Sequence, residues 1–177
     1  MSIQTKKEII TGLTTQFDAF MQTIATFPEA HFEDMPNGKW SAGQNLHHLI
    51  SSVNPLHLAF AMPKFILKWQ FGKPNREPRT YEALVERYQE KLANGGTAPI
   101  AFEPPVIPLL QREKLLKNYL NHKNRLVSSV EKWSEHDLDN YLLPHPLLGK
   151  LTLREMLFFT IYHNEHHRKA VDKIAKS

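Results

Sequence analysis

The chain has 177 residues, a length that fits one domain able to bury a core without stabilising cross-links. It contains no cysteine, which excludes disulfides, thiolate metal sites and a cysteine nucleophile. Lys and Arg exceed Asp and Glu by 22 to 18, giving a scattered net charge of +4. Because no single element carries a basic stripe, we expect no binding to nucleic acid.

Helical periodicity dominates from the N-terminus onward. The first predicted helix runs from about Thr5 to Thr26 and stops near Pro28. Apolar residues recur along one side of it, namely Ile9, Leu13, Phe17, Phe20 and Ile24. This stripe predicts a helix that packs one face against a core.

The second predicted helix begins at Ser41, because Ser41 and Gln44 have the spacing of a capping box. Its apolar stripe consists of Leu46, Leu49, Ile50, Val53, Leu56 and Phe60. Pro55 falls inside this run, so we expect a kink there or a break into two helices. The basic segment Lys64 to Arg79 that follows is predicted to be a loop flank.

A shorter helix is predicted from Tyr81 to Ala93. The linker from Asn94 to Pro108 is rich in Gly and Pro, and loops of that length are often functional, so we expect it to wall a pocket. The third long helix begins near Leu109 or Leu110. Its predicted core side carries Leu115, Tyr119, His122, Leu126, Val130 and Trp133. Residues 134–137 are predicted to form a short capped turn.

The last predicted helix runs from Thr152 to Ala175, and Thr152 and Glu155 form a second capping box at its start. Its core-facing stripe contains Leu153, Met156, Leu157, Thr160, Val171 and Ile174. His163 and His167 fall inside this stripe, four residues apart and therefore on one helix face. Their neighbour His166 lies toward its edge. Two imidazoles placed in this way can bind one metal ion from a single helix.

Two interpretations of this histidine pair stay open. A core-facing histidine is usually hydrogen-bonded to a carbonyl or a carboxylate, and no metal is then needed. An unpartnered polar group in a core costs about 1–3 kcal/mol, and one metal ion would satisfy both rings at once.

Four long amphipathic helices with long connections predict an all-α protein, a single four-helix bundle domain over residues 1–177. We expect one additional short helix and long connections that contain Pro and Gly. Metal sites in such bundles are built from inward-facing side chains of neighbouring helices. For a third ligand the sequence offers four candidates, and periodicity alone does not choose among them: His47, His48, His57 and His122.

Other polar residues are less informative. Asn45, Ser52 and Asn164 lie near the candidate ligands on their own helices, where each could be a cap or a surface group. Trp40 is expected to pack at the entry of the second helix. Three further histidines lie in loop-like sequence and receive no role, namely His31, His136 and His145.

Two segments resemble the DinB/YfiT-like superfamily. In the first, Trp40 and Ser41 open a helix and His48 follows the tryptophan by eight residues. In the second, the stretch from Gly149 leads to the HxxxH pair of His163 and His167. The resemblance implies a four-helix bundle that binds one divalent metal through His48, His163 and His167. Many members carry Gln three residues after the second histidine of the pair, where this chain has Ala170.

The resemblance implies zinc or nickel as the metal, and we keep iron and manganese as alternatives. Three neutral imidazoles with an open position are the arrangement of a catalytic zinc site. Two activities follow from the resemblance: metal-dependent hydrolysis, or transfer of a low-molecular-weight thiol. No catalytic residue is identified, because Asn164 stands where an HExxH protease has Glu, and Glu165 falls on the outer face. The alternatives are a non-catalytic, stress-associated metal or small-molecule binder, and a core whose histidines bind no metal.

The expected partner is a small-molecule substrate, and we expect a homodimer. No apolar run approaches the roughly 20 residues that a membrane span needs. Residues Met1 to Glu8 are polar and lack the apolar stretch of a secretory signal. We therefore expect a cytoplasmic protein with no membrane partner.

Overall fold

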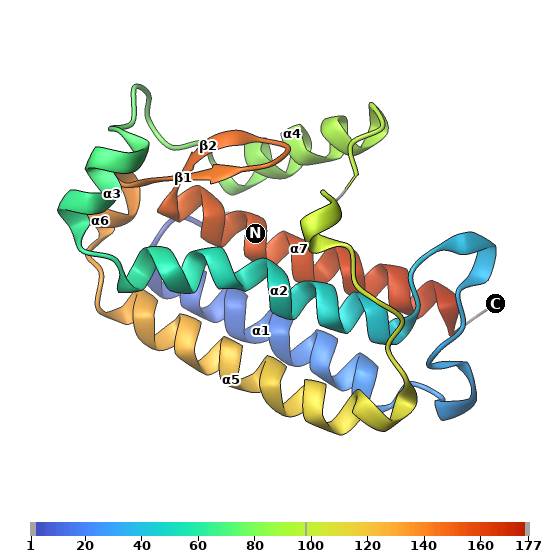
Figure 1. The fold of residues 1–177 in the computed structure, drawn as a ribbon. Helices are drawn as coiled ribbons and strands as arrows, with labels where there is room; N and C mark the ends of the chain where they lie inside the picture. Colours follow the sequence, from blue (N-terminus) through green and yellow to red (C-terminus); the bar gives the residue numbers. More distant parts are fainter. Residues whose placement is uncertain (1–2, 98, 176–177) are drawn as a thin grey trace.

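In the computed structural model, residues 3–97 and 99–175 are described, and they form a helical bundle with a small hairpin (Figure 1). The four long helices are α1 (Lys6–Ala25), α2 (Ala42–Ala61), α5 (Arg112–Glu131) and α7 (Leu153–Ile174). The shorter elements are α3 (Lys64–Phe71), α4 (Tyr81–Ala93), α6 (Glu135–Asn140), β1 (Leu142–His145) and β2 (Gly149–Thr152). The predicted four-helix bundle is confirmed. Within the described ranges, no helix has both the length and the apolar character needed to cross a bilayer.

The core of the bundle lies between the four long helices. Both α1 and α2 pack against α5 and α7, so α1 and α2 lie diagonally across the bundle. All five apolar residues predicted for the first helix are buried, namely Ile9, Leu13, Phe17, Phe20 and Ile24. Outside the bundle, α4 and the hairpin lie along α7, on the side away from α1 and α5 (Figure 1). The hairpin therefore covers α7 where a bundle of four helices alone would leave it open.

The starts of α2 and α7 are fixed by the two predicted capping boxes. The Ser41 hydroxyl accepts a hydrogen bond from the Gln44 N–H, and the Gln44 side chain accepts one from the Ser41 N–H. Thr152 and Glu155 repeat this exchange at α7. Because each cap satisfies N–H groups that have no partner inside the helix, it sets the residue at which the helix begins.

One prediction for the middle of the chain is wrong. Residues Lys64–Phe71 form α3 and not a loop flank. Only Leu67 of this helix is buried, so the segment shows no apolar stripe. Of the two outcomes expected at Pro55, a kink or a break, the break does not occur, because α2 continues as one helix to Ala61. Proline removes one hydrogen bond of the helix, but the buried residues on both sides of it hold the backbone in place.

The hairpin of β1 and β2 was not predicted either. Its strands are antiparallel, with Leu142 opposite Thr152 and His145 opposite Gly149. Each strand has four residues, and Pro144 interrupts the first, so neither shows the alternation by which strands are recognised. Among the described residues there are also three short α-helices, besides 3-10 turns, where one short helix was expected: α3, α4 with the predicted bounds, and α6, which extends the predicted capped turn.

Candidate metal centre

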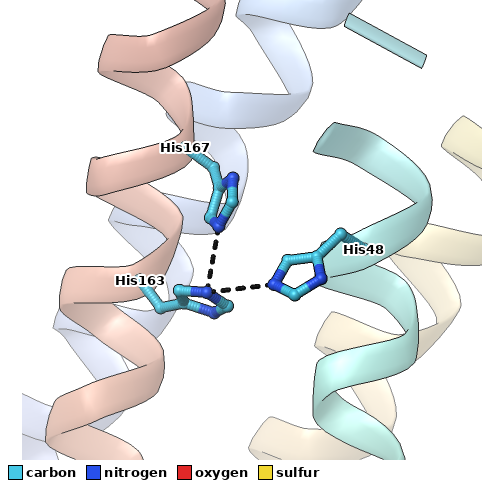
Figure 2. Close-up of side chains that lie close together, drawn as sticks. All are labelled: His48, His163 and His167. Atoms are coloured by element: carbon cyan, nitrogen blue, oxygen red, sulfur yellow. Dashed lines mark hydrogen bonds between the residues drawn. The ribbon is translucent and has the colours of Figure 1, made fainter. Parts of the chain in front are cut away.

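Three histidine side chains meet between α2 and α7. His48 projects from α2, whereas His163 and His167 project from successive turns of α7, and all three rings point toward one another (Figure 2). The Nε2 atom of His163 lies 3.2 Å from Nε2 of His48 and 3.0 Å from Nε2 of His167. All three rings are at least nine-tenths buried. The two histidines of the predicted HxxxH pair and His48 thus form one cluster.

The spacing of these nitrogens fits a metal ion. Two imidazole nitrogens bound to one tetrahedral zinc at about 2.0–2.1 Å lie roughly 3.3 Å apart. The three candidate ligand atoms lie within 4.8 Å of one another, and two of the three separations are close to the tetrahedral value. The cluster therefore needs only small side-chain adjustments to hold a metal.

The outward-facing nitrogens of two rings are hydrogen-bonded to acceptors. Nδ1–H of His48 donates to the Phe102 carbonyl at 2.8 Å, and Nδ1–H of His167 donates to Oδ1 of Asn45 at 2.7 Å. A neutral imidazole carries one hydrogen, so in both rings Nε2 presents a lone pair to the cluster. Metal-binding histidines have this arrangement, because the second nitrogen fixes the tautomer and the ring orientation.

Asn45 itself is held by the first turn of α2. Its Nδ2 group donates to the carbonyls of Trp40 at 3.1 Å and Ser41 at 2.8 Å. The amide nitrogen is therefore committed, and Oδ1 has to face His167. Since the Ser41 cap sets the start of α2, the same local structure that begins the helix also orients a ring on α7.

Burial keeps the cluster neutral. It lowers the pKa of His163 and of His167 well below the usual value, and the neighbouring histidines lower both further. Burial also lowers the pKa of His48, partly offset by the hydrogen bond to Phe102. With lone pairs on Nε2 of His48 and His167, the single hydrogen that His163 can place on its Nε2 serves only one of them. A divalent cation would satisfy all three nitrogens, so these residues fit a metal.

The other candidates for the third ligand lie elsewhere. His57 of α2 pairs with His122 of α5, with Nε2 and Nδ1 3.0 Å apart. His47 is half-buried and does not line the cavity beside the cluster. His166 does line this cavity, and its ring lies 5.2 Å from that of His167, centre to centre. Only His48 joins the pair on α7.

The cluster opens onto a cavity of about 1100 Å³. Trp40 forms part of its wall, with its ring 4.7 Å from that of His48 and 6.0 Å from that of His167, centre to centre. The tryptophan thus reaches the candidate ligands besides packing at the helix entry. The linker contributes Pro99 and Phe102, which confirms that it walls a pocket.

The lining of the cavity is mostly apolar and carries no acidic group. Among the described residues that line it, the charged side chains are Lys39, Lys169 and Lys173, and none is Asp or Glu. Glu165, which was predicted on the outer face of the helix, does not line the cavity and pairs with Lys169 at 2.6 Å. No carboxylate is therefore positioned in this wall to act as a general base.

Comparison with known protein families identifies the family of this chain. Residues 12–171 match the profile of the DinB superfamily, which covers most of the chain. The chain belongs to the DinB superfamily.

A solved structure shows the same fold. YfiT from Bacillus subtilis, described as a probable metal-dependent hydrolase with an unusual four-helix bundle topology, matches with a TM-score of 0.62 and 17% sequence identity. The alignment covers 97% of this DinB superfamily chain and 86% of YfiT. Comparison with curated protein sequences found no match.

Sequence reasoning about this DinB superfamily protein missed residues that other segments bring to the site. His145, which received no role, lies buried in the cavity wall, and so does Tyr88 of α4. Of the polar residues noted near the ligands, only Asn45 bonds to one, since the Ser52 hydroxyl donates to the Leu49 carbonyl and Asn164 accepts from Tyr119. The contacts of Asn45 with His167 and of Asn164 with Tyr119 join segments far apart in the chain, so no local pattern signals them.

Replacing Asn45 by alanine is expected to weaken metal binding by about 10–100-fold, the usual effect of losing a partner that orients a metal ligand. His167 would lose the acceptor of its Nδ1–H and with it a fixed ring orientation. Zinc affinity, measured by competition with a chromogenic chelator, tests this. Ser52→Ala is the control, because Ser52 lies on the same helix and its hydroxyl bonds to the Leu49 carbonyl and not to a candidate ligand. Equal affinities in both variants would contradict the role given to Asn45.

Proposed function

We propose that this protein is a metal-dependent enzyme that binds a divalent metal through His48, His163 and His167 and a small-molecule substrate in the adjoining cavity. The observation that supports this most strongly is the convergence of three buried imidazole nitrogens at the wall of a large apolar cavity. Catalytic pockets have this composition, an apolar lining with a few polar groups that point inward. Zinc or nickel suits three nitrogen ligands best, ahead of iron or manganese.

The chain supplies three ligands and leaves room for a fourth. Three histidines with an open position are the arrangement of catalytic zinc sites, whereas structural sites have four protein ligands. When bound in this way, a divalent metal lowers the pKa of a coordinated water or thiol toward neutrality. The residues of this chain keep their Nε2 lone pairs directed at that metal and exclude bulk water by burial.

Hydrolysis is the first candidate reaction. YfiT, which shares this fold, is described as a probable metal-dependent hydrolase. The neutral histidine cluster and the half-buried His166 beside it provide the polar groups that such a reaction would use. The substrate would carry an ester, amide or related bond next to an apolar body.

Transfer of a low-molecular-weight thiol is the second candidate, and the composition of the cavity favours it. No Asp or Glu is found among the described lining residues, so the cavity wall offers no group for a reaction that requires a carboxylate base. A metal deprotonates a bound thiol more readily than a bound water, because the free thiol is already the stronger acid, so thiol transfer depends less on such a base. Since the chain has no cysteine, the thiol would come from a cosubstrate.

The test combines metal content with two assays on protein purified without a histidine tag. We expect about one metal ion per chain by plasma emission. We also expect either hydrolysis of p-nitrophenyl butyrate or conjugation of cysteine with monobromobimane at rates above those of the His48→Ala, His163→Ala double variant. Equal rates in both proteins, with metal bound only by the wild type, would instead support a non-catalytic metal or small-molecule binder. Equal metal content would contradict the site itself.

A further inference from the structure

His145 is the last residue of β1 and lies in the cavity wall with 7% of its surface exposed. Its ring packs edge-on against Phe159, with the ring centres 4.3 Å apart, and against Tyr88 at 6.5 Å. The hairpin turn that follows holds it in place. His145 is thus a rigid polar group in a wall that is otherwise largely apolar.

One nitrogen of this ring is used by the hairpin turn. Nδ1 of His145 accepts hydrogen bonds from the backbone N–H groups of Leu147, at 3.1 Å, and Leu148, at 3.2 Å. A nitrogen that accepts two hydrogen bonds carries no hydrogen, so the hydrogen of the neutral ring is on Nε2. Burial lowers the pKa of His145 to about 4, which keeps the ring neutral near pH 7.

The other nitrogen is free to serve a ligand. Nε2–H of His145 has no hydrogen-bond partner among the described residues, although the residue is buried. Although most of the residue is buried, Nε2 itself keeps accessible surface, unlike the fully buried, unpartnered Nδ1 of His57, so water or a ligand in the cavity can reach it. The cavity is the space from which such a partner would come.

His145 also lies close to the metal centre. The Phe159 ring stacks on His163, with the centres 4.7 Å apart, and also packs edge-on against His145. Tyr88 contacts both histidines. His145 and the candidate metal ligand His163 therefore share two aromatic neighbours in one cavity wall, so a small molecule bound at the metal site would lie near His145.

We propose that His145 is a substrate-binding residue, whose Nε2–H donates a hydrogen bond to an oxygen of a ligand that also occupies the open position of the metal. This inference rests on the proposed function, and it adds the substrate class: a molecule with a metal-binding group and an oxygen acceptor a short distance away. Both features belong to thiols and acyl compounds that carry a carboxylate or carbonyl.

Two substitutions separate this role from the role of His145 in the turn. In His145→Asn, the side-chain oxygen takes the place of Nδ1 and caps the turn as an Asx turn does, but the Nε2–H donor is lost. In His145→Gln, the amide N–H₂ takes the place of Nε2, and the acceptor for the turn is lost. If His145 only holds the turn, His145→Asn should preserve ligand binding better than His145→Gln. If His145 binds substrate, His145→Gln should preserve it better.

The experiment uses the cobalt-loaded protein and follows the thiolate-to-cobalt absorption band. Mercaptoacetate, 3-mercaptopropionate and 4-mercaptobutyrate are compared with ethanethiol, 1-propanethiol and 1-butanethiol, which bind the metal but offer no oxygen. We expect the wild type to prefer at least one mercaptocarboxylate over its matched alkanethiol. We expect His145→Asn to lose about tenfold of this preference, the effect of one hydrogen bond to a charged acceptor, and His145→Gln to retain most of it.

The outcomes are distinct. The same preference in the wild type and in His145→Asn would overturn the proposal, and so would an equal loss in both variants, since that result points to the turn. A wild type that shows no absorption band with any thiol would contradict the open metal position, and the inference about His145 would fall with the proposed function. Melting of the metal-free variants gives a separate readout, with His145→Gln expected to melt about 2–4 °C below His145→Asn.

Discussion

Replacing His163 by alanine is expected to abolish stoichiometric metal binding. His163 is the middle histidine of the cluster, with its Nε2 within 3.2 Å of both other Nε2 atoms. Structural zinc sites with four ligands contribute about 10–16 kcal/mol, so one ligand is worth about 3 kcal/mol, or roughly a hundredfold in affinity. Plasma emission on dialysed protein and titration with zinc measure the loss. Chelation should also lower the melting temperature of the wild type and leave that of His163→Ala unchanged.

The matched control is His57→Ala. His57 is also buried in the bundle and also faces another histidine, His122 of α5, at 3.0 Å. It belongs to no group of three ligands among the described residues, so this variant should keep its metal. If His57→Ala lost as much metal as His163→Ala, the loss would reflect a general disturbance of the bundle, and the assignment of the site would be wrong.

The long helices were predictable because their signals are local. Ser41 with Gln44, and Thr152 with Glu155, mark helix starts within four residues of sequence, and both boxes form as predicted. Segments without such signals were missed. The helix around Leu67 buries one residue of eight, and its exposed Phe65 and Trp69 hide the pattern further. Here packing of α3 against strand β1 of the hairpin favours the helix, and β1 lies too far along the chain to appear in a local sequence pattern.

The candidate metal site was also predictable only in part. The pairing of His163 with His167 follows from the geometry of one helix, so the residues alone indicated it. Which histidine of the second helix completes the cluster depends on how α2 is rotated against α7. Periodicity left four candidates, and the resemblance to the family selected His48, which the structure places beside His163.

The supporting contacts could not be predicted, because they join distant segments. The Phe102 carbonyl that accepts from His48 comes from the linker, and Asn45 reaches His167 across 122 residues of sequence. His145 is brought to the cavity by a hairpin that has no sequence signature. The ligands were therefore more predictable than the groups that orient them.

Replacing Glu155 by alanine is expected to give the largest loss of stability among these variants, about 3–5 kcal/mol, or roughly 10 °C in melting temperature. The Glu155 carboxylate is fully buried and accepts hydrogen bonds from the Arg76 side chain at 2.8 and 3.0 Å, from the Arg79 N–H at 2.9 Å and from the Thr152 N–H at 2.9 Å. It thereby fastens the segment between α3 and α4 to the start of α7. Its loss would leave Arg76 and Arg79 without this acceptor and would remove half of the capping box of α7, since only the bond from the N–H of residue 155 to the Thr152 hydroxyl would remain.

Urea unfolding of the wild type and Glu155→Ala measures this difference, and Glu165→Ala on the same helix is the control. Glu165 is half-buried and pairs with the exposed Lys169 at 2.6 Å, and ion pairs that stay in contact with solvent contribute less than about 1 kcal/mol. A loss in Glu155→Ala no greater than that in Glu165→Ala would show that the buried carboxylate does not hold the segment in place.

The contribution of Glu155 should also depend on pH in a defined direction. Although burial alone would raise the pKa of Glu155, the hydrogen bonds from Arg76, Arg79 and Thr152 lower it below its usual value of 4.5. A carboxyl whose pKa is lower in the folded state stabilises the fold above its unfolded pKa, and that stabilisation is lost as the pH falls through the folded pKa. The stability difference between the wild type and Glu155→Ala should therefore be constant above about pH 5.5 and shrink below about pH 4.5. A difference that stayed constant down to about pH 3 would contradict an ionised, hydrogen-bonded Glu155.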